Sequence, residues 1–273
     1  MRDDLLPVLA CPVCAEPLGR ADGGQVGCAN GHRYDEAKQG HLTLLPPKRR
    51  ALTADTPEMV DARIRFLGRG HYAPVERAIA EVVAAATAPG VVLDVGSGPG
   101  TYLAHALDAA PRSLGISLDL SPVAIRRAAR VHERAGAVVG DVTERLPVVD
   151  GAAAVLLDVF APRNQTEYAR VLHRDGVLVV VTPRTGHLAE LAAATISVDP
   201  EKERRLHDSL TPSFAPRSSQ DLTWVMDLSA DDVHDVVHMG PSHHHVDPDT
   251  VFAAATVTAA VTVSTWVPAP SVP

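Results

Sequence analysis

Short apolar segments alternate with helical segments from Val91 onward, and this alternation restricts the fold more than any other feature of the chain. The pattern predicts strands at residues 91–95, 113–118, 137–139, 153–158 and 176–182. It predicts helices near residues 100–110, 122–134, 165–172 and 187–196. Strands and helices in this order are typical of a parallel β-sheet with helices on both faces. The predicted fold class is therefore α/β.

The C-terminal part is expected to complete this sheet with a hairpin. A polar stretch, "SLTPSFAPRSSQ" (209–220), precedes "LTWVMDLS" and a helix in "ADDVHDVVHM". The run "ATVTAAVTVSTWV" (255–267) is rich in Val and Thr, which favour strands. We expect it to form the last strand.

All three cysteines of the chain lie near its start, in "CPVCAEPLGRADGGQVGCANGH" (11–32). Zinc prefers four sulfur or nitrogen ligands in a tetrahedron, and a C-x2-C turn directs both sulfurs towards one ion. We therefore predict Zn²⁺ bound by Cys11, Cys14, Cys28 and His32. Because the protein fills all four positions, the zinc is expected to be structural and not catalytic.

The cysteine cluster and a change of composition divide the chain into three predicted parts. Residues 1–45 form a turn-rich zinc-ribbon-like module, which is too small to fold without metal. Residues 46–72 form a linker, marked by Pro46 and Pro47, and a helix at 59–72. Residues 73–273 begin with a second helix at 73–88 and form the α/β domain.

Composition limits where such a chain acts. Its apolar runs are too short to span a bilayer, and "MRDDLLPVLACP" has acids where a signal peptide has basic residues. We expect a soluble, cytoplasmic protein without a membrane partner. The net charge of −8 disfavours general binding to polyanions, although basic residues exceed acids between Arg33 and Arg69. Contact with a nucleic acid is expected there, around Lys48, Arg49 and Arg50, although these charges also suit a solvated linker.

A glycine-rich turn lies between the first strand and its helix, in "VVLDVGSGPGTYLAHAL" (91–107). Gly96, Gly98 and Gly100 allow a ligand to approach the backbone, and the helix start offers free N–H groups. Asp119 ends the next strand, about twenty residues further on, where a carboxylate can bind both hydroxyls of a ribose.

This arrangement suits both dinucleotides and S-adenosylmethionine, and three details favour the second. The turn lacks the G-x-G-x-x-G spacing of dinucleotide sites. Asp94 suits the positively charged amino-acid or sulfonium end of S-adenosylmethionine, and Asp141 follows the third strand, where it can hold an adenine amine. We therefore predict a Rossmann-like class I S-adenosylmethionine-dependent methyltransferase.

Several longer stretches resemble one family. These are "CPVC", "CANGHRYDEAKQGHLTLL", "ADTPEMVDARIRFLGRGHYAP", "LDVGSGPGTY", "DVFAPRN" and "VVVTPRTGHLAEL". They resemble the 23S ribosomal RNA (guanine-N1-)-methyltransferases, including the branch linked to macrolide resistance of the tylosin and mycinamicin type. The resemblance implies zinc at the four predicted ligands, and it implies methylation of a guanine in a hairpin loop of 23S rRNA. It also implies cofactor contacts at Tyr72, Gly100, Thr101 and His187.

The implied reaction sets requirements for the site. Guanine N1 carries a proton at neutral pH and lies on the Watson–Crick edge, so the base must be unpaired and must lose that proton. In "LLDVFAPRN" at the end of the fourth strand, Asp158 is a candidate proton acceptor and Phe160 a candidate stacking partner. Asn164 is a candidate donor to the guanine carbonyl. An alternative for Asp158 is a strand-end carboxylate satisfied by backbone N–H groups.

Two other functions remain compatible with the sequence. One is methylation of a small natural product, but compact methyltransferases of that kind generally lack an N-terminal zinc module. The other is a non-catalytic protein whose zinc module binds RNA or protein. The sequence leaves open whether the chain forms a homodimer.

Overall fold

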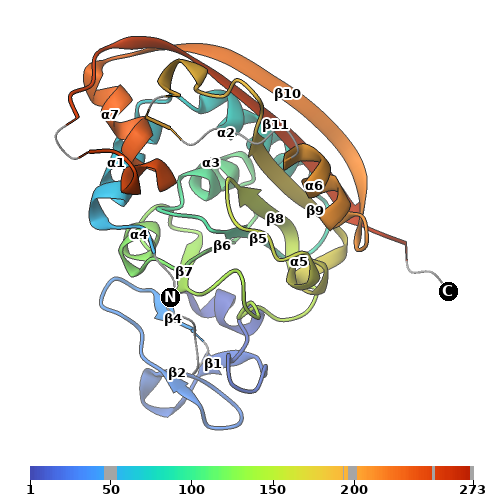
Figure 1. The fold of residues 1–273 in the computed structure, drawn as a ribbon. Coiled ribbons are helices and arrows are strands. Elements are labelled where there is room, and N and C mark those ends of the chain that lie inside the picture. Colours follow the sequence, from blue (N-terminus) through green and yellow to red (C-terminus); the bar gives the residue numbers. More distant parts are fainter. Residues whose placement is uncertain (46–53, 193, 196–201, 248–249, 271–273) are drawn as a thin grey trace.

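The computed structural model describes residues 1–45, 54–192, 194–195, 202–247 and 250–270 (Figure 1). An eight-stranded sheet lies at the centre, in the order β10-β11-β9-β8-β5-β6-β7-β4. Its strands are β4 (Leu42–Thr43), β5 (Val91–Val95), β6 (Gly115–Asp119), β7 (Ala135–Val139), β8 (Ala153–Val159), β9 (Leu172–Pro183), β10 (Phe214–Leu228) and β11 (Ala255–Pro268). The predicted α/β fold is confirmed.

The central strands β5 to β9 pair in parallel, and β4 joins them in parallel beside β7. Their carboxyl ends therefore meet at one edge of the sheet. The glycine turn after β5 and the acids Asp119 and Asp141 lie at this edge, as ligand sites do in open α/β sheets.

Helices cover both faces of the sheet (Figure 1). They are α1 (Pro57–Gly68), α2 (Ala73–Ala85), α3 (Thr101–Ala109), α4 (Pro122–Ala128), α5 (Gln165–Val171), α6 (Lys202–Leu210) and α7 (Ala230–His238). Apolar residues of α1, α2, α3 and α7 share one core cluster, whereas those of α5 and α6 share another. Leu156 and Leu157 of β8 belong to opposite clusters, because successive side chains of a strand point to opposite faces.

The N-terminal module packs directly on the sheet. It begins with the 3₁₀ helix η1 (Asp3–Val8) and contains the antiparallel strands β1 (Leu18–Arg20), β2 (Val26–Cys28) and β3 (Arg33–Tyr34). Its buried side chains Leu9 and Leu18 share one core cluster with Leu146 and Val148 of the main body. The short strand β4 then enters the large sheet, with Leu42 opposite Val138. The predicted division into three domains stays a prediction.

The C-terminal hairpin is confirmed, and it is longer than expected. Strand β10 begins at Phe214, inside the stretch expected to be a polar connection, and its solvent-facing residues explain that composition. Strand β11 lies between β9 and β10 and pairs antiparallel with both. Figure 1 shows this long hairpin, in orange and red, along one side of the molecule.

One predicted helix is wrong. The helix expected over 187–196 is replaced, in its described residues, by a turn and the 3₁₀ helix η3 (Ala189–Leu191). Gly186 and Leu188 both have positive φ angles, of 88° and 55°, and an α-helix cannot continue through such residues. Helix α6 was not predicted. Among the described residues, none of the helices is long and apolar enough to cross a membrane.

Candidate active site and metal centre

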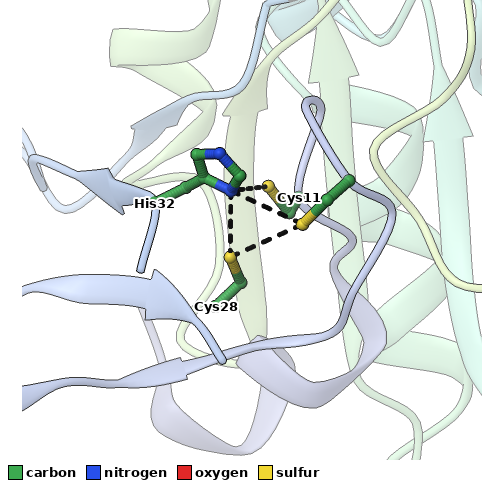
Figure 2. A group of neighbouring side chains, drawn as sticks. Cys11, Cys28 and His32 are labelled. Carbon is green, nitrogen blue, oxygen red and sulfur yellow. Dashed lines mark hydrogen bonds between the residues drawn. The ribbon is translucent and has the colours of Figure 1, made fainter. Parts of the chain in front are cut away.

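Three cysteine sulfurs and one histidine nitrogen meet in the N-terminal module. The Sγ atoms of Cys11, Cys14 and Cys28 and the Nδ1 atom of His32 all lie within 4.8 Å of one another (Figure 2). The three sulfurs are 3.5, 3.5 and 3.3 Å from Nδ1, and Cys14 Sγ is 3.7 Å from Cys28 Sγ. A tetrahedron with zinc–sulfur bonds of about 2.3 Å has edges of roughly 3.7 Å. The four residues therefore fit a zinc ion.

A hydroxyl supports this cluster from outside. The Tyr34 hydroxyl lies 2.9 Å from Cys11 Sγ. Burial opposes ionisation of Cys11, but the Tyr34 hydroxyl and the backbone N–H groups of Val13 and Cys14 lower the pKa of the thiol to about 6. The thiolate is the form that binds zinc, so these donors favour the ligand state.

Two glycines allow the turn that brings Cys28 and His32 together. Gly31 has a φ of 85°, and the backbone N–H of Cys28 donates to the carbonyl of His32 at 3.1 Å. A Cβ atom on Gly27 would lie 2.7 Å from the same carbonyl oxygen, closer than real contacts allow. Any other residue at 27 would displace this turn.

A cavity of about 420 Å³ opens at the carboxyl edge of the sheet. The sequence-predicted residues Gly96, Asp119 and Asp141 line it, together with Phe160. Gly96 has a φ of 66°, and a Cβ atom there would lie 2.5 Å from the Cβ of Ala161. The glycine turn and the loop after β8 are therefore in close contact across the cavity.

Backbone N–H groups orient the two acids in the cavity. Asp119 accepts hydrogen bonds from the N–H groups of Gly98 and Ser121, at 2.8 and 2.7 Å. Burial raises the pKa of Asp119, although those N–H groups oppose the shift. Asp141 accepts from the backbone and the hydroxyl of Thr143, at 2.9 and 2.7 Å.

Asp94 lies beneath the glycine turn and is 1% exposed. Burial and the nearby charges of Asp119 and Asp158 raise its pKa well above the ordinary value. Its Oδ2 atom is buried without a hydrogen-bond partner. Such atoms are rare in folded proteins and indicate a missing donor or cation.

An aromatic cluster gathers three residues from distant parts of the chain. The hydroxyl oxygen of Tyr72 lies 3.2 Å from Nε2 of His187. The Phe160 ring lies 6.1 Å from the Tyr72 ring and 6.2 Å from the His187 ring, between centroids. Phe160 also lines the cavity. Tyr72 and His187, which the family resemblance implies as cofactor contacts, therefore lie next to the cavity. Gly100 and Thr101 begin α3, directly after the glycine turn.

The two candidate catalytic residues lie outside the cavity lining. Asp158 is 0% exposed, and its Oδ2 accepts a hydrogen bond from the Tyr168 hydroxyl at 3.0 Å. The Asn164 side chain caps α5 and donates to the carbonyls of Val142 and Glu144, each at 3.0 Å. Both side chains hold the loop after β8, and their direct contact with a base stays a prediction.

Comparison with known proteins agrees with the zinc site and the cavity. A family model described as the N-terminal region of RlmA matches residues 9–51. The 23S rRNA (guanine(748)-N(1))-methyltransferase of Streptomyces fradiae is 45% identical, over 91% of this chain and 90% of the relative. The chain belongs to the 23S rRNA (guanine-N1) methyltransferase family. A Micromonospora griseorubida protein, provisionally named as a methyltransferase of this kind, is 43% identical to our methyltransferase, over 98% of this chain and 100% of the relative.

A solved structure supports the fold of the methyltransferase. One chain in the complex between the Haloferax volcanii Trm112 methyltransferase activator and a methyltransferase superposes with a TM-score of 0.53 at 14% identity. The match covers 80% of our chain and 99% of the other. At this low identity the similarity concerns the fold alone.

The residues of the methyltransferase fit its two cofactors. Zinc fits the Cys3His cluster by its donor atoms and distances. S-adenosylmethionine, which supplies an activated methyl group, fits a cavity that offers a carboxylate for the ribose at Asp119. The orphaned carboxylate oxygen of Asp94 suits the cationic end of the same molecule.

Sequence reasoning missed two charged residues of the cavity lining, Asp55 and Arg63. Both lie in the stretch that carries the family resemblance, one before α1 and one within it. In the sequence they are only two opposite charges eight residues apart, which is a weak indication of a binding site. The tertiary fold is what places them over the glycine turn.

Proposed function

We propose that this protein transfers the methyl group of S-adenosylmethionine to N1 of a guanine in a hairpin loop of 23S rRNA. The observation that carries the proposal is the 45% identity, over 91% of the chain, with the Streptomyces fradiae enzyme whose name gives this reaction. The proposal places the protein in the cytoplasm, where ribosomal RNA is modified. In macrolide-producing bacteria such a methyl group would protect the ribosome.

The residues of the cavity divide the work of binding the methyl donor. Asp119 is oriented by two backbone N–H groups and would accept hydrogen bonds from the ribose hydroxyls. Asp141 would hold the adenine amine. The buried carboxylate of Asp94, just before the glycine turn, would bind the amino-acid end. Fixing the donor in this way aligns its methyl carbon with the acceptor nitrogen, which is the main task of the protein.

The loop after β8 would receive the guanine. Phe160 is 39% exposed at the rim of the cavity, although most aromatic side chains of the protein are buried. Its φ of 56° is a strained conformation for a residue other than glycine, and such strain is concentrated at functional sites. An exposed ring at this edge suits stacking on an unpaired base.

Asp158 and Asn164 would act on the guanine through this loop. Asp158 is bonded to Tyr168, whose hydroxyl oxygen also lies 3.0 Å from the carbonyl of Pro162. Asn164 joins the same loop to the loop after β7, which contains Asp141. We propose that the two residues position the base-binding loop relative to the donor. Direct proton transfer to Asp158 is the alternative.

The zinc module would contact the RNA beside the cavity. Residues 46–53, which include Lys48, Arg49 and Arg50, lie outside the described residues. The described chain on either side supports the proposal: Leu44 bonds to the end of β7, and Ala54 lines the cavity. We propose that Lys48, Arg49 and Arg50 contribute contacts to the RNA around the target base.

The test is methylation of defined RNA by the zinc-loaded protein. Labelled S-adenosylmethionine is incubated with 23S rRNA that lacks native modifications, and primer extension locates the product, since N1-methylguanine blocks the reverse transcriptase. We expect one stop in a hairpin loop of 23S rRNA. A protein that binds the donor but labels only small molecules would instead support the natural-product alternative, and one that labels neither would support the non-catalytic binder.

A further inference from the structure

Arg63 of α1 extends over the glycine turn of the cavity. Its Nη1 atom lies 2.6 Å from Oδ2 of Asp55, and its Nη2 atom donates to the carbonyl of Met239. A Cβ atom placed on Gly98 would lie 2.8 Å from Nη1, so the guanidinium lies directly against the turn. The Arg63 side chain is 23% exposed.

The charges around the cavity are unevenly distributed. Among the described residues that line it, Arg63 alone carries a positive charge, whereas Asp55, Asp119 and Asp141 carry negative charges. S-adenosylmethionine has a positive sulfonium, a positive ammonium and one negative carboxylate. Asp119 suits the ribose hydroxyls, Asp141 the adenine amine and the buried Asp94 the cationic end, and a carboxylate cannot accept the carboxylate of the ligand.

We propose that Arg63 binds the methionine carboxylate of S-adenosylmethionine and thereby makes the enzyme select donors that carry this group. The inference rests on the proposed function, because it concerns the same donor site.

The guanidinium has the capacity for this contact. Arginine has five N–H donors. Asp55 contacts Nη1 and the carbonyl of Met239 accepts from Nη2, so neither contact uses Nε. The remaining N–H groups can reach a carboxylate in the paired geometry that arginine favours. Asp55 is itself fixed, because the Ser121 hydroxyl donates to its backbone carbonyl at 2.9 Å. The arginine is therefore held in place before the ligand arrives.

A different role for Arg63 would be to brace the Gly98 turn without touching the donor. The two roles differ in one measurable property. A bracing residue affects every ligand of the cavity equally, whereas a carboxylate-binding residue affects only ligands that have the carboxylate.

The test compares two donors on the zinc-loaded, full-length protein. Calorimetry measures the affinity of S-adenosylmethionine and of its decarboxylated analogue for the wild type, Arg63→Gln and Arg63→Lys. We expect the wild type to prefer S-adenosylmethionine by about 10- to 100-fold, as for one charge-assisted contact. Arg63→Gln should lose this preference by binding S-adenosylmethionine more weakly and the analogue almost unchanged. Arg63→Lys, which keeps the charge but not the paired donors, should retain part of it.

Arg65→Gln is the matched control. Arg65 lies two residues away on α1 and pairs with Asp235 of α7, outside the cavity lining. This variant should keep the full preference between the two donors. The proposal would be overturned if Arg63→Gln bound both donors more weakly by the same factor, or if it bound both as tightly as the wild type does. A wild-type protein that binds neither donor would instead contradict the proposed function itself.

Discussion

The hydroxyl oxygen of Tyr72 lies 3.2 Å from Nε2 of His187, while the backbone N–H of Ala260 donates to Nδ1 of the same ring at 3.1 Å. Because Nδ1 accepts a hydrogen bond, the neutral ring carries its proton on Nε2 and donates it to Tyr72. The Tyr72 hydroxyl hydrogen is then directed to another acceptor. Burial raises the pKa of Tyr72, so this hydrogen stays in place at neutral pH.

We predict that Tyr72→Phe weakens binding of S-adenosylhomocysteine by about 5- to 10-fold, as for one lost hydrogen bond. The fold should be retained, since the ring stays packed between Phe66 and Trp224. Calorimetry measures the affinity. Phe66→Leu is the packing control, because it alters the same core cluster without removing a hydroxyl, and it should lower the melting temperature but keep the affinity. An unchanged affinity in Tyr72→Phe would exclude this tyrosine from the donor site.

Local patterns account for what the sequence could predict of the site. The zinc ligands lie within 22 residues, and their spacing already specifies a tetrahedral cluster. Asp119 ends one parallel strand and Asp141 follows the next, so topology alone brings them to the edge that carries the glycine turn.

Contacts between distant segments account for what it could not predict. The position of Arg63 depends on how α1 docks over the sheet, and the burial of Asp158 depends on Tyr168, which belongs to a later helix. Strand β4 has only two residues, too few for any periodicity. The apolar pattern after Gly186 is compatible with a helix, but Leu188 adopts a left-handed conformation in the structure.

Loss of the metal should destabilise the N-terminal module and the sheet edge beneath it. We predict that Cys14→Ser loses zinc and lowers the melting temperature by at least roughly 5 °C, because the module shares its core with Leu146. Elemental analysis and differential scanning calorimetry measure both effects. Tyr34→Phe should keep the metal but bind it about 10-fold more weakly, since it removes only the hydrogen bond to Cys11. Full zinc occupancy in Cys14→Ser would contradict the predicted ligand set.

The junction of α1 and α7 should show a pH dependence. Burial opposes ionisation of Asp232, but hydrogen bonds from Ser229 and His71 and contact with Arg69 hold the pKa of this carboxyl well below its ordinary value. A depressed carboxyl pKa stabilises the fold above the unfolded value of about 4, and this contribution declines as the pH falls further. Asp232→Asn should therefore be less stable by about 1–2 kcal/mol at pH 7. Urea unfolding at several pH values measures the difference in free energy of unfolding between the wild type and Asp232→Asn. This difference should become smaller below about pH 4, and a difference that stays constant would show that the Asp232 carboxylate is not its source.

Phe160 offers a test of the base-binding loop. Because its φ of 56° favours glycine, Phe160→Gly should be at least as stable as Phe160→Ala, despite the extra flexibility of glycine. Both variants should lose most RNA methylation but keep most of their affinity for the donor, since the exposed ring is expected to stack on the guanine and not on the donor. Thermal unfolding and single-turnover methylation measure the two properties. Full methylation by Phe160→Ala would remove stacking from the mechanism.

Asp158 can act on the guanine directly or through its neighbours, and the geometry favours the second. The Tyr168 hydroxyl lies 3.0 Å from both Asp158 Oδ2 and the carbonyl of Pro162, and it has one hydrogen to donate. Because Asp158 and the Pro162 carbonyl compete for this hydrogen, we expect a change at Asp158 to alter how the loop that contains Pro162 is held. If Asp158 and Tyr168 act together to position the loop, Asp158→Asn and Tyr168→Phe should lower kcat by similar factors. The kcat of the double variant should be little lower than that of either single variant.

The pH dependence of methylation separates this role from general-base catalysis. If Asp158 accepts the N1 proton, Asp158→Asn removes the acidic limb of the pH–rate profile and lowers kcat by about 100-fold or more, whereas Tyr168→Phe keeps that limb. We expect the limb to persist in both variants, because the carboxylate is fully buried and bonded to Tyr168. Asn164→Ala should likewise lower kcat without changing the affinity for the donor, since Asn164 links the same loop to Val142. Selective loss of the limb in Asp158→Asn would instead establish this residue as the base, and the loop would then have to open during each turnover.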